Sequence, residues 1–565
     1  MARFSTLLLF WLTATLARAE SAEFPIHLAP DSPPLTQAGV PQLHESVDQA
    51  LHAEDGLAFN PETPFQWAHL ASTPAQHLSF TAAADSELYD HATLTVWNWH
   101  NRPVAQHQFA PGEPAIFKIA VHGLGTYQVT IDGCRNDQIV KRRVRSFAVT
   151  EDLNAARETW KTDEFFLGVC AFPGRYHWSF KGNPTLPSEL TEDQARQLEA
   201  TLLARLGFQV VRPDESLEMG FQNGSYQFDG KRMDAAVEAY TSRGLQLALQ
   251  LMNAPDWAIA NRYADVETNL WRYPREEAHQ RHYVRELLRR YGTNARFIQI
   301  FNEPDQKAFW SGTPQEYVAQ FQYTTDEIRN VDPEKPIVNG GYSLVDLDRT
   351  QTFVEALHDD VDMVAYHSHG SLLDLKEDVA IMKSLHRQAG LPMPRLVNTE
   401  MGYDGWRLDQ ERRKGQIVPQ KTLYCWKSGH AGALLFGGRM TLGPRRTNQD
   451  FGFLDHHFCP RFVYGSVAAL VSVLQGAPYH STLQETDELF VYQFHRDEQR
   501  ILAAFTLRES GSLHIQSDAE SGELIDEMGN RTPIDDPQNF QLSLTGYPRY
   551  VILNNATSVT SNADH

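Results

Sequence analysis

The stretch RFIQIFNEPDQ, residues 296–306, decides how the middle of this 565-residue chain folds. Four of the five residues from Phe297 to Phe301 are apolar, and only Gln299 interrupts them. Apolar runs of this length are typical of strands in parallel sheets, which are covered on both faces. The run stops at an Asn-Glu-Pro triplet. The sequence therefore places an acid, Glu303, at the carboxyl end of a buried strand.

Similar apolar runs alternate with helical patterns on both sides of this stretch. The predicted strands are 165–172, 208–214, 245–257, 296–304, 336–342, 361–370, 394–402 and 432–438, each followed by a segment with helical periodicity. Eight such units within residues 160–478 predict an α/β fold, a (β/α)8 TIM barrel with loop insertions. The alternative is an open, doubly wound sheet. No glycine-rich phosphate loop follows the first strand, which favours the barrel.

The barrel segment is flanked by two regions with the alternating pattern of β-strands. Residues 61–155 contain short runs such as HATLTVWNWH (91–100) and predict an N-terminal β-sandwich. Residues 479–556 predict a small C-terminal β domain, in which EMGN (527–530) suits a hairpin turn. Residues 20–60 are rich in Pro, Ala and Asp and are interpreted as a leader or an extended packing arm.

The first 19 residues have the features of a secretory signal peptide. Arg3 supplies a positive start, residues 7–16 are mostly apolar, and Ala17-Arg18-Ala19 fits the small-x-small cleavage rule. A membrane anchor is the alternative, but the run is far shorter than the ~20 residues that span a bilayer. We expect cleavage after Ala19, a secreted or periplasmic protein and no membrane insertion. In a eukaryotic host the sequons at Asn223, Asn530 and Asn555 would be glycosylation acceptors.

Charge and cysteine content narrow the classes of partner. The formal net charge of −21 repels phosphate backbones, so nucleic acid is not an expected partner. Four widely spaced cysteines resemble neither a metal knuckle nor a dense disulfide framework. Cys425 and Cys459 both flank the last predicted barrel strand and could form a disulfide, and free buried thiols are the alternative. The sequence leaves the oligomeric state open.

Two predicted strands end in a glutamate, Glu303 on the fourth and Glu400 on the seventh. The chemistry of this type of barrel sits at the carboxyl ends of the strands. Two carboxylates facing one cavity are what cleavage of a glycosidic bond requires, because one protonates the leaving oxygen while the other attacks the anomeric carbon or activates water. An isolated Asn-Glu-Pro is also a helix-start signal. A second glutamate at a matched strand end favours the catalytic interpretation.

The two motifs resemble those of the retaining glycoside hydrolases of clan A. FNEP ends the fourth strand, and NTEMGYDGW (398–406) ends the seventh. The resemblance implies that Glu303 is the acid/base, that Asn302 contacts the sugar 2-hydroxyl and that Glu400 is the nucleophile. In layout the chain is most similar to glycoside hydrolase family 39, the family of β-xylosidases and α-iduronidases. NAPDWA (253–258), DFGFLD (450–455) and the C-terminal β domain also resemble that layout.

The chain departs from the clan pattern at two places. Clan members often carry a tryptophan at the end of the eighth strand, where this chain has Phe436 and Arg439. The N-terminal sandwich is not a standard part of the family 39 layout. The sugar, the linkage and the choice between exo and endo action therefore stay open.

Further residues at the strand ends are candidates for substrate binding. Arg212 resembles the clan's second-strand arginine that orients the nucleophile, and a structural ion pair is the alternative. Tyr366, His367 and His369 lie where the clan often places a His or Tyr beside the nucleophile. His367 and His369 would face the same way on an extended strand, as a metal pair would. No third ligand follows at a useful spacing, so we expect no metal, and the mechanism needs no cofactor.

Aromatic residues in the loops after the strands are candidates for stacking on sugar rings. They are Trp257, Trp310, Tyr403 and Trp406, and loop packing is the alternative for each. Trp97 and Trp99 alternate on a sandwich strand, where core burial is preferred to a carbohydrate platform.

The sequence predicts an exported retaining glycoside hydrolase acting on a plant- or microbe-derived oligosaccharide or polysaccharide. One alternative is a catalytically silent carbohydrate-binding protein on the same barrel. Another is an inverting glycosidase, which the separation of the two glutamates distinguishes.

Overall fold

The computed structural model describes residues 23–28, 56–61, 68–70, 78–100, 102–121, 123–160, 163–173, 190–265, 272–404, 408–439, 451–455 and 457–563. It divides into two compact units, Met1–Val149 and Thr150–His565. The predicted signal peptide lies outside the described residues. Within them, no helix is both long enough and apolar enough to cross a bilayer.

The described part of the first unit is a β-sandwich. One sheet has the order β1 (Glu23–Leu28), β7 (Ala115–Val121), β4 (Leu78–Ala84) and β2 (Leu57–Pro61). The other has the order β3 (Ala68–Leu70), β9 (Gln138–Thr150), β8 (Gly125–Arg135), β5 (His91–Trp97) and β6 (Pro103–Phe109). Phe80 of one sheet contacts Phe147 of the other, with ring centroids 5.3 Å apart. Strand β1 pairs with β7, so the range 20–60, which we expected to be a leader or arm, contributes a strand to this sheet.

The two tryptophans of the WNW run are buried in this unit. The indole N–H of Trp97 donates to the Thr130 hydroxyl at 3.0 Å. Trp99 packs edge-on against Tyr127 at 5.7 Å. Both belong to the core, the preferred interpretation of the sequence, and neither forms a surface platform.

In the second unit, eight of the described strands close into a parallel barrel, as the apolar runs predicted. In order they are β10 (Phe166–Ala171), β11 (Val210–Pro213), β14 (Gln246–Leu251), β15 (Ala295–Ile300), β16 (Ile337–Val338), β17 (Met363–Ser368), β18 (Arg395–Met401) and β19 (Gly432–Leu435). Strand β19 pairs with β10 and completes the ring. Side chains such as Phe166, Val210, Phe297 and Val397 fill the interior. The barrel is therefore a packed core, and only its rims can bind ligands.

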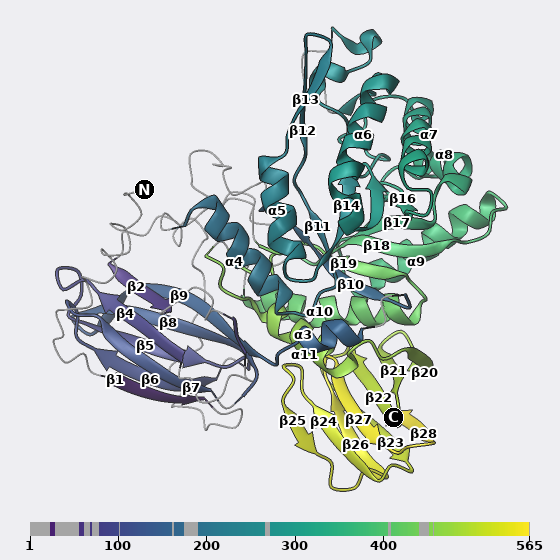
Figure 1. Cartoon of the computed structure of the whole chain (residues 1–565). Helices are drawn as coiled ribbons and strands as arrows, with labels where there is room; N and C mark the ends of the chain where they lie inside the picture. The colour runs from purple at the N-terminus through teal and green to yellow at the C-terminus, as the bar shows by residue number, and fades with distance from the viewer. Residues whose placement is uncertain are drawn as a thin grey trace. The chain divides into compact units, whose positions relative to one another are not determined.

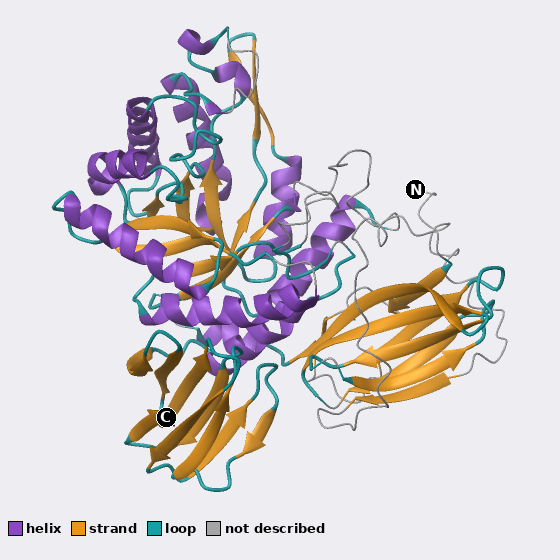
Figure 2. Cartoon of the chain, turned by 180° about the vertical axis from the view of Figure 1, so that it is seen from behind, coloured by secondary structure: helices purple, strands orange, loops and turns teal. Residues whose placement is uncertain are grey.

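Helices surround the barrel strands (Figure 2). They are α3 (Asn154–Thr159), α4 (Glu192–Ala204), α5 (Lys231–Thr241), α6 (Glu277–Tyr291), α7 (Pro314–Val331), α8 (Leu347–Leu357), α9 (Leu372–Gln388), α10 (Leu408–Lys427) and α11 (Phe462–Leu474). Short 3-10 turns are η3 (Asp256–Ala258), η4 (Asn261–Tyr263), η6 (Gly292–Asn294) and η7 (His358–Asp360). Thr191, Thr313 and Ser371 each form a capping box that satisfies the first N–H groups of α4, α7 and α9.

A β-hairpin that the sequence analysis missed is inserted after β11. It consists of β12 (Glu218–Gln222) and β13 (Ser225–Asp229), and Figure 1 shows it extending beyond the barrel strands. Asn223 and Gly224 form its turn with φ of 51° and 74°. Asn-Gly is the usual sequence for a two-residue turn with both φ angles positive, so the run QNGS carried the signal.

The C-terminal strands form two further sheets. One has the order β20 (Tyr479–Glu485), β21 (Leu489–Arg496), β22 (Gln499–Thr506), β27 (Arg549–Asn554), β24 (Ser521–Ile525) and β25 (Arg531–Pro533). The other has the order β26 (Asn539–Leu544), β23 (Gly511–Ser517) and β28 (Val559–Ala563). Strands β24 and β25 pair antiparallel across the predicted EMGN turn.

All four cysteines lie within the described residues and are free and buried. The disulfide between Cys425 and Cys459 is therefore absent, and free buried thiols are what the structure contains. The Cys425 thiol lies 3.8 Å from the Met401 sulfur, inside the packing of α10 against β18.

Candidate active site

Glu303 follows β15 on a strained piece of backbone. Phe301 has φ of 69° and Glu303 has φ of 42°, a region that costs a residue with a side chain about 1–3 kcal/mol. The Glu303 N–H donates to the Gly340 carbonyl at 2.9 Å, which holds this bend. The carboxylate Oε1 lies 2.6 Å from His367 Nδ1, and Oε2 accepts a 2.7 Å hydrogen bond from Gln306 Nε2. Both oxygens of the buried carboxylate are thus held in place.

Glu400 lies near the end of β18 among positively charged and imidazole groups. Arg212 donates to its Oε1 at 2.6 Å. His367 Nδ1 and His369 Nε2 lie 3.5 and 3.4 Å from its Oε2. Burial alone would raise the pKa of Glu400, but the charges of His367 and Arg212 and the hydrogen bond from His369 outweigh burial and hold the pKa well below its usual range. These surroundings favour the ionised form of Glu400, which is the form that a nucleophile needs.

Arg212 joins the two strand ends that carry the glutamates. Its second nitrogen donates to the Asn302 side-chain oxygen at 2.6 Å, and Gln250 Nε2 donates to the same oxygen at 3.3 Å. These donors occupy the amide oxygen, so the amide NH2 is the part of Asn302 that can donate to a ligand. The ion pair expected as the alternative role of Arg212 is also the contact that orients Glu400.

The two glutamates and two histidines form one cluster. Glu303, His367, His369 and Glu400 each offer one nitrogen or oxygen, and these four atoms lie within 4.8 Å of one another. Imidazole and carboxylate groups are ligands that zinc accepts, so these are the described residues that could hold a divalent cation. The Arg212 guanidinium against Glu400 places a positive charge beside the cluster, which disfavours a cation. A metal-free site stays a prediction.

Three of the predicted site residues within the described ranges are not brought to the carboxylates. Tyr366 alternates with His367 along β17 and points to the opposite face, where its hydroxyl lies 2.8 Å from His430 Nε2. Trp310 is 1% exposed, and its indole N–H donates to the Thr313 carbonyl at 3.0 Å. Both side chains belong to the packing behind the rim. Trp257 is 42% exposed beside the inserted hairpin, and Trp406 lies outside the described residues.

Phenylalanines stand where a tryptophan was expected after the eighth strand. Phe436 packs edge-on against His369 with centroids 4.9 Å apart and against Phe451 at 5.1 Å. Because His369 contacts Glu400, this group forms an apolar wall beside the nucleophile. Arg439 lies away from it, buried with its guanidinium 4.5 Å from the centre of the Phe458 ring.

Two residues that the sequence analysis did not select lie behind the two glutamates and His367. Gly341 has φ of 73°, and a Cβ there would lie 2.1 Å from His367 Nε2. Only glycine lets this backbone pass the imidazole, and the paired glycines in VNGGY (338–342) were the available signal. Nothing in the sequence marked Gln306 as a site residue. Only the turn after Glu303 brings its amide to the carboxylate.

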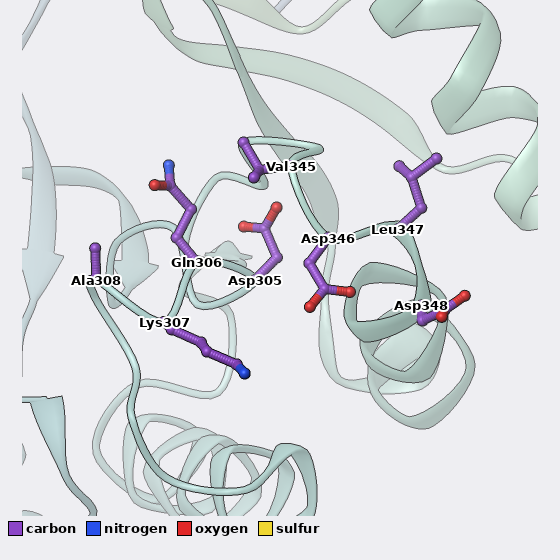
Figure 3. A pocket seen from close by; sticks show the side chains of 8 residues that line it. All are labelled: Asp305, Gln306, Lys307, Ala308, Val345, Asp346, Leu347 and Asp348. Atoms are coloured by element: carbon purple, nitrogen blue, oxygen red, sulfur yellow. The ribbon is translucent and has the colours of Figure 1, made fainter.

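A cavity of about 490 Å³ opens beside the loop that carries Glu303 (Figure 3). Residues 305–308 and 345–348, which follow β15 and β16, line it. Gln306 both lines this cavity and donates to Glu303. Its volume falls within the range of small-molecule sites, and Glu303 and Glu400 are not among the residues that line it.

Comparison with known proteins supports the fold. No family model matches the sequence, and no curated protein matches it. Among solved structures, a family 39 glycoside hydrolase from the gut symbiont Bacteroides cellulosilyticus WH2 aligns with a TM-score of 0.65 at 15% identity, over 88% of this chain and 100% of that one. A monomeric β-xylosidase from Caulobacter crescentus aligns at 0.48 and 13% identity, over 69% and 95% of the two chains. The chain therefore has the fold layout that its motifs resemble.

Proposed function

We propose that the protein is an exported retaining glycoside hydrolase that cleaves O-glycosidic bonds of plant- or microbe-derived oligosaccharides or polysaccharides. One observation carries the proposal: oxygens of Glu303 and Glu400 lie within 4.8 Å of each other at the carboxyl ends of two strands of one barrel. Retaining glycosidases separate their carboxyl groups by about 5–5.5 Å, and inverting ones by about 6.5–9.5 Å to admit a water. The short separation favours retention over inversion.

In the first step Glu400 attacks the anomeric carbon while Glu303 delivers a proton to the departing oxygen. The bond from the anomeric carbon to the leaving oxygen breaks, and an ester bond to Glu400 forms. The lowered pKa of Glu400 keeps the attacking group ionised. Gln306 and His367 hold the two oxygens of Glu303, which orients the acid toward its target.

In the second step the roles of Glu303 reverse. As a carboxylate it removes a proton from water, and the resulting oxygen attacks the anomeric carbon. Glu400 departs as a carboxylate, stabilised by the positive charge of Arg212. Two inversions at the same carbon give net retention, and both glutamates return to their starting states.

The neighbouring polar groups position the sugar and the nucleophile. Resemblance to the clan implies that Asn302 contacts the 2-hydroxyl of the sugar. Its side-chain oxygen already accepts two hydrogen bonds, so its amide NH2 is the suitable donor. His369 is partly exposed beside Glu400, so it can contact substrate, whereas buried His367 acts between the two carboxylates.

Two measurements test the proposal: the stereochemistry of the product, and the trapping of the covalent intermediate. A panel of aryl glycosides, oligosaccharides and polysaccharides identifies a substrate, and proton NMR then follows the first-formed anomer. We expect retained configuration. The matching 2-deoxy-2-fluoro glycoside should label Glu400, read by peptide mass spectrometry. An inverted product would support the inverting alternative, and binding without any hydrolysis would support the silent carbohydrate-binding protein.

A further inference from the structure

The inserted hairpin is more than the barrel needs to connect a strand to a helix. Such connections usually take about 2–6 residues, whereas β11 ends at Pro213 and α5 begins at Lys231. The extra residues form β12 and β13, which pair along their length. A folded insertion of this kind at a barrel rim is typically functional.

The hairpin holds a cluster of aromatic rings in fixed positions. Phe221 stacks on Trp257 of η3 with centroids 5.8 Å apart and planes 18° apart. The Trp257 indole N–H donates to the Met219 carbonyl at 2.9 Å. The Tyr226 hydroxyl lies 2.8 Å from His279 Nδ1 of α6, and its ring stacks on His282 at 3.8 Å. The polar atoms of Trp257 and Tyr226 are therefore satisfied within the cluster.

The exposed part of this cluster is unusual and small. Phe221 is 44% exposed and Trp257 is 42% exposed. With about 150–250 Å² for each side chain, the two expose about 200 Å² together. A stable protein interface needs about 800 Å² on each partner, so a second protein is a poor match. A sugar ring, whose C–H face is of similar size to an aromatic ring, matches well.

The cluster stands at the end of the barrel that carries the glutamates. The hairpin follows β11, which contains Arg212, and η3 follows β14, the neighbouring strand. Figure 1 shows β12 and β13 beyond the barrel strands at this end. A glycan chain bound at the glutamates could therefore extend across the rim to reach the rings.

We propose that Phe221 and Trp257 form a stacking platform for sugar units of a polymeric substrate, away from the bond that is cleaved. This rests on the proposed function, and it names the substrate class as a polysaccharide or long oligosaccharide. The hydrogen bond of Trp257 to Met219 and the stacking of Phe221 on Trp257 already restrain the rings, so binding costs little side-chain entropy. The platform adds affinity only for chains long enough to reach it from the glutamates.

The test compares polymer with a short substrate in Phe221→Ala. The polymer is the soluble polysaccharide that the wild type cleaves fastest among xylan, arabinan, galactan and glucomannan. We expect kcat/KM on this polymer to fall about tenfold more than kcat/KM on an aryl glycoside, mainly through KM. Phe221→Tyr keeps a ring and should restore the ratio. Leu373→Ala on α9 removes a side chain that is 52% exposed and serves as the matched control.

Affinity electrophoresis in the same polysaccharides separates this proposal from the proposed function. A wild type that cleaves none of these glycans can still migrate more slowly in a gel that contains one of them. If Phe221→Ala does not migrate more slowly there, the platform is supported. Equal losses of kcat/KM on both substrates would overturn it in favour of a structural role for Phe221. A wild type that cleaves aryl glycosides but neither cleaves nor is retarded by any polymer would also overturn it, as would a dimer that Phe221→Ala dissociates.

Discussion

At the scale of single residues, the two glutamates differ in the groups that surround them. Arg212 and two imidazoles face Glu400, whereas Glu303 contacts one imidazole and the neutral amide of Gln306. The positive charge favours an ionised Glu400, and no arginine or lysine is among the hydrogen-bond partners described for the Glu303 side chain. Separate variants of the two residues can test this division.

Replacing Glu400 with alanine should abolish turnover while substrate still binds. The variant lacks the nucleophile, but the pocket and Glu303 remain. Added azide can fill the vacated space and attack the anomeric carbon, so activity on aryl glycosides should partly return and the product should be a glycosyl azide of inverted configuration. The rate with and without azide and NMR of the product are the measurements. Turnover close to that of the wild type would exclude Glu400 as the nucleophile.

Glu303→Gln should separate substrates by their leaving groups. Dinitrophenyl glycosides depart without protonation, so the variant should form the glycosyl-enzyme and then stall, giving a burst followed by slow release. Natural glycosides should lose about 10²–10⁴-fold in rate, the usual contribution of a general acid. Stopped-flow kinetics on both substrates measure the difference. An equal loss of rate on both kinds of substrate would mean that Glu303 is not the acid/base.

At the scale of elements, the backbone after β16 sets the position of a side chain on β17. A Cβ at Gly341 would lie 2.1 Å from His367 Nε2, and the φ of 73° is unfavourable for any other residue. His367 contacts both glutamates, so moving it disturbs the pair.

Gly341→Ala should therefore lower kcat by at least about tenfold, because misplaced catalytic groups are costly. Gly390→Ala is the control, since Gly390 also has positive φ but no atom lies within 4 Å of its added Cβ. Both substitutions strain the backbone, because both glycines have positive φ. Only Gly341→Ala should alter the pH profile of kcat/KM. Equal profiles in the two variants would argue against a role for Gly341 in placing His367.

On the other face of β17, Tyr366 contacts His430, and this histidine should make the protein less stable in acid. Burial lowers the pKa of His430, whose Nε2 faces the Tyr366 hydroxyl, to about 3. Above about pH 6.5 the histidine is neutral in both states. Between about pH 6.5 and 3 the unfolded chain binds a proton that the native state does not, so the native state loses stability as pH falls, by about 1.4 kcal/mol per pH unit.

His430→Gln removes this proton uptake and keeps a polar partner for Tyr366. The free energy of unfolding of the variant, relative to the wild type, should rise by about 2 kcal/mol between pH 6.5 and 5. Urea denaturation at both pH values measures it. A difference that does not change with pH would mean that His430 titrates alike in both states.

At the scale of the molecule, the barrel and the C-terminal strands belong to one compact unit. Trp426 of α10 links them, stacking on Phe165 at 4.8 Å and packing edge-on against Phe494 of β21 at 5.2 Å. Lys376 and Lys427 of the barrel helices both pair with Glu485 of β20. We expect the barrel and these strands to unfold together.

Trp426→Ala should destabilise this unit by about 3–5 kcal/mol, the usual cost of removing a buried tryptophan. Calorimetry should show the transition of residues 150–565 moving as a whole to lower temperature. Leu373→Ala, at an exposed site on α9, should leave it in place. A C-terminal transition that shifts without the barrel transition would contradict this prediction, and so would no shift at all.

The sequence by itself determined the barrel and the strand ends at which the two glutamates lie. Hydrophobic periodicity is a local property, and apolar runs alternating with helical patterns are enough to specify strand–helix units. Once the strands close, their carboxyl ends must meet at one rim, so Glu303 and Glu400 come together without further information. The Asn-Gly turn of the inserted hairpin is equally local, and QNGS carried its signal although the sequence analysis overlooked it.

Only the tertiary structure decided which neighbouring side chains belong to the site. Tyr366 and His367 alternate along β17, so one side chain meets His430 and the other meets the glutamates. A register shift against β18 places Glu400 opposite His367. Trp310 is buried, and Cys425 and Cys459 stay apart as thiols, because the packing of distant elements surrounds them. Alternation along a strand defines two faces, but which face meets the rim depends on pairing with strands far away in the chain.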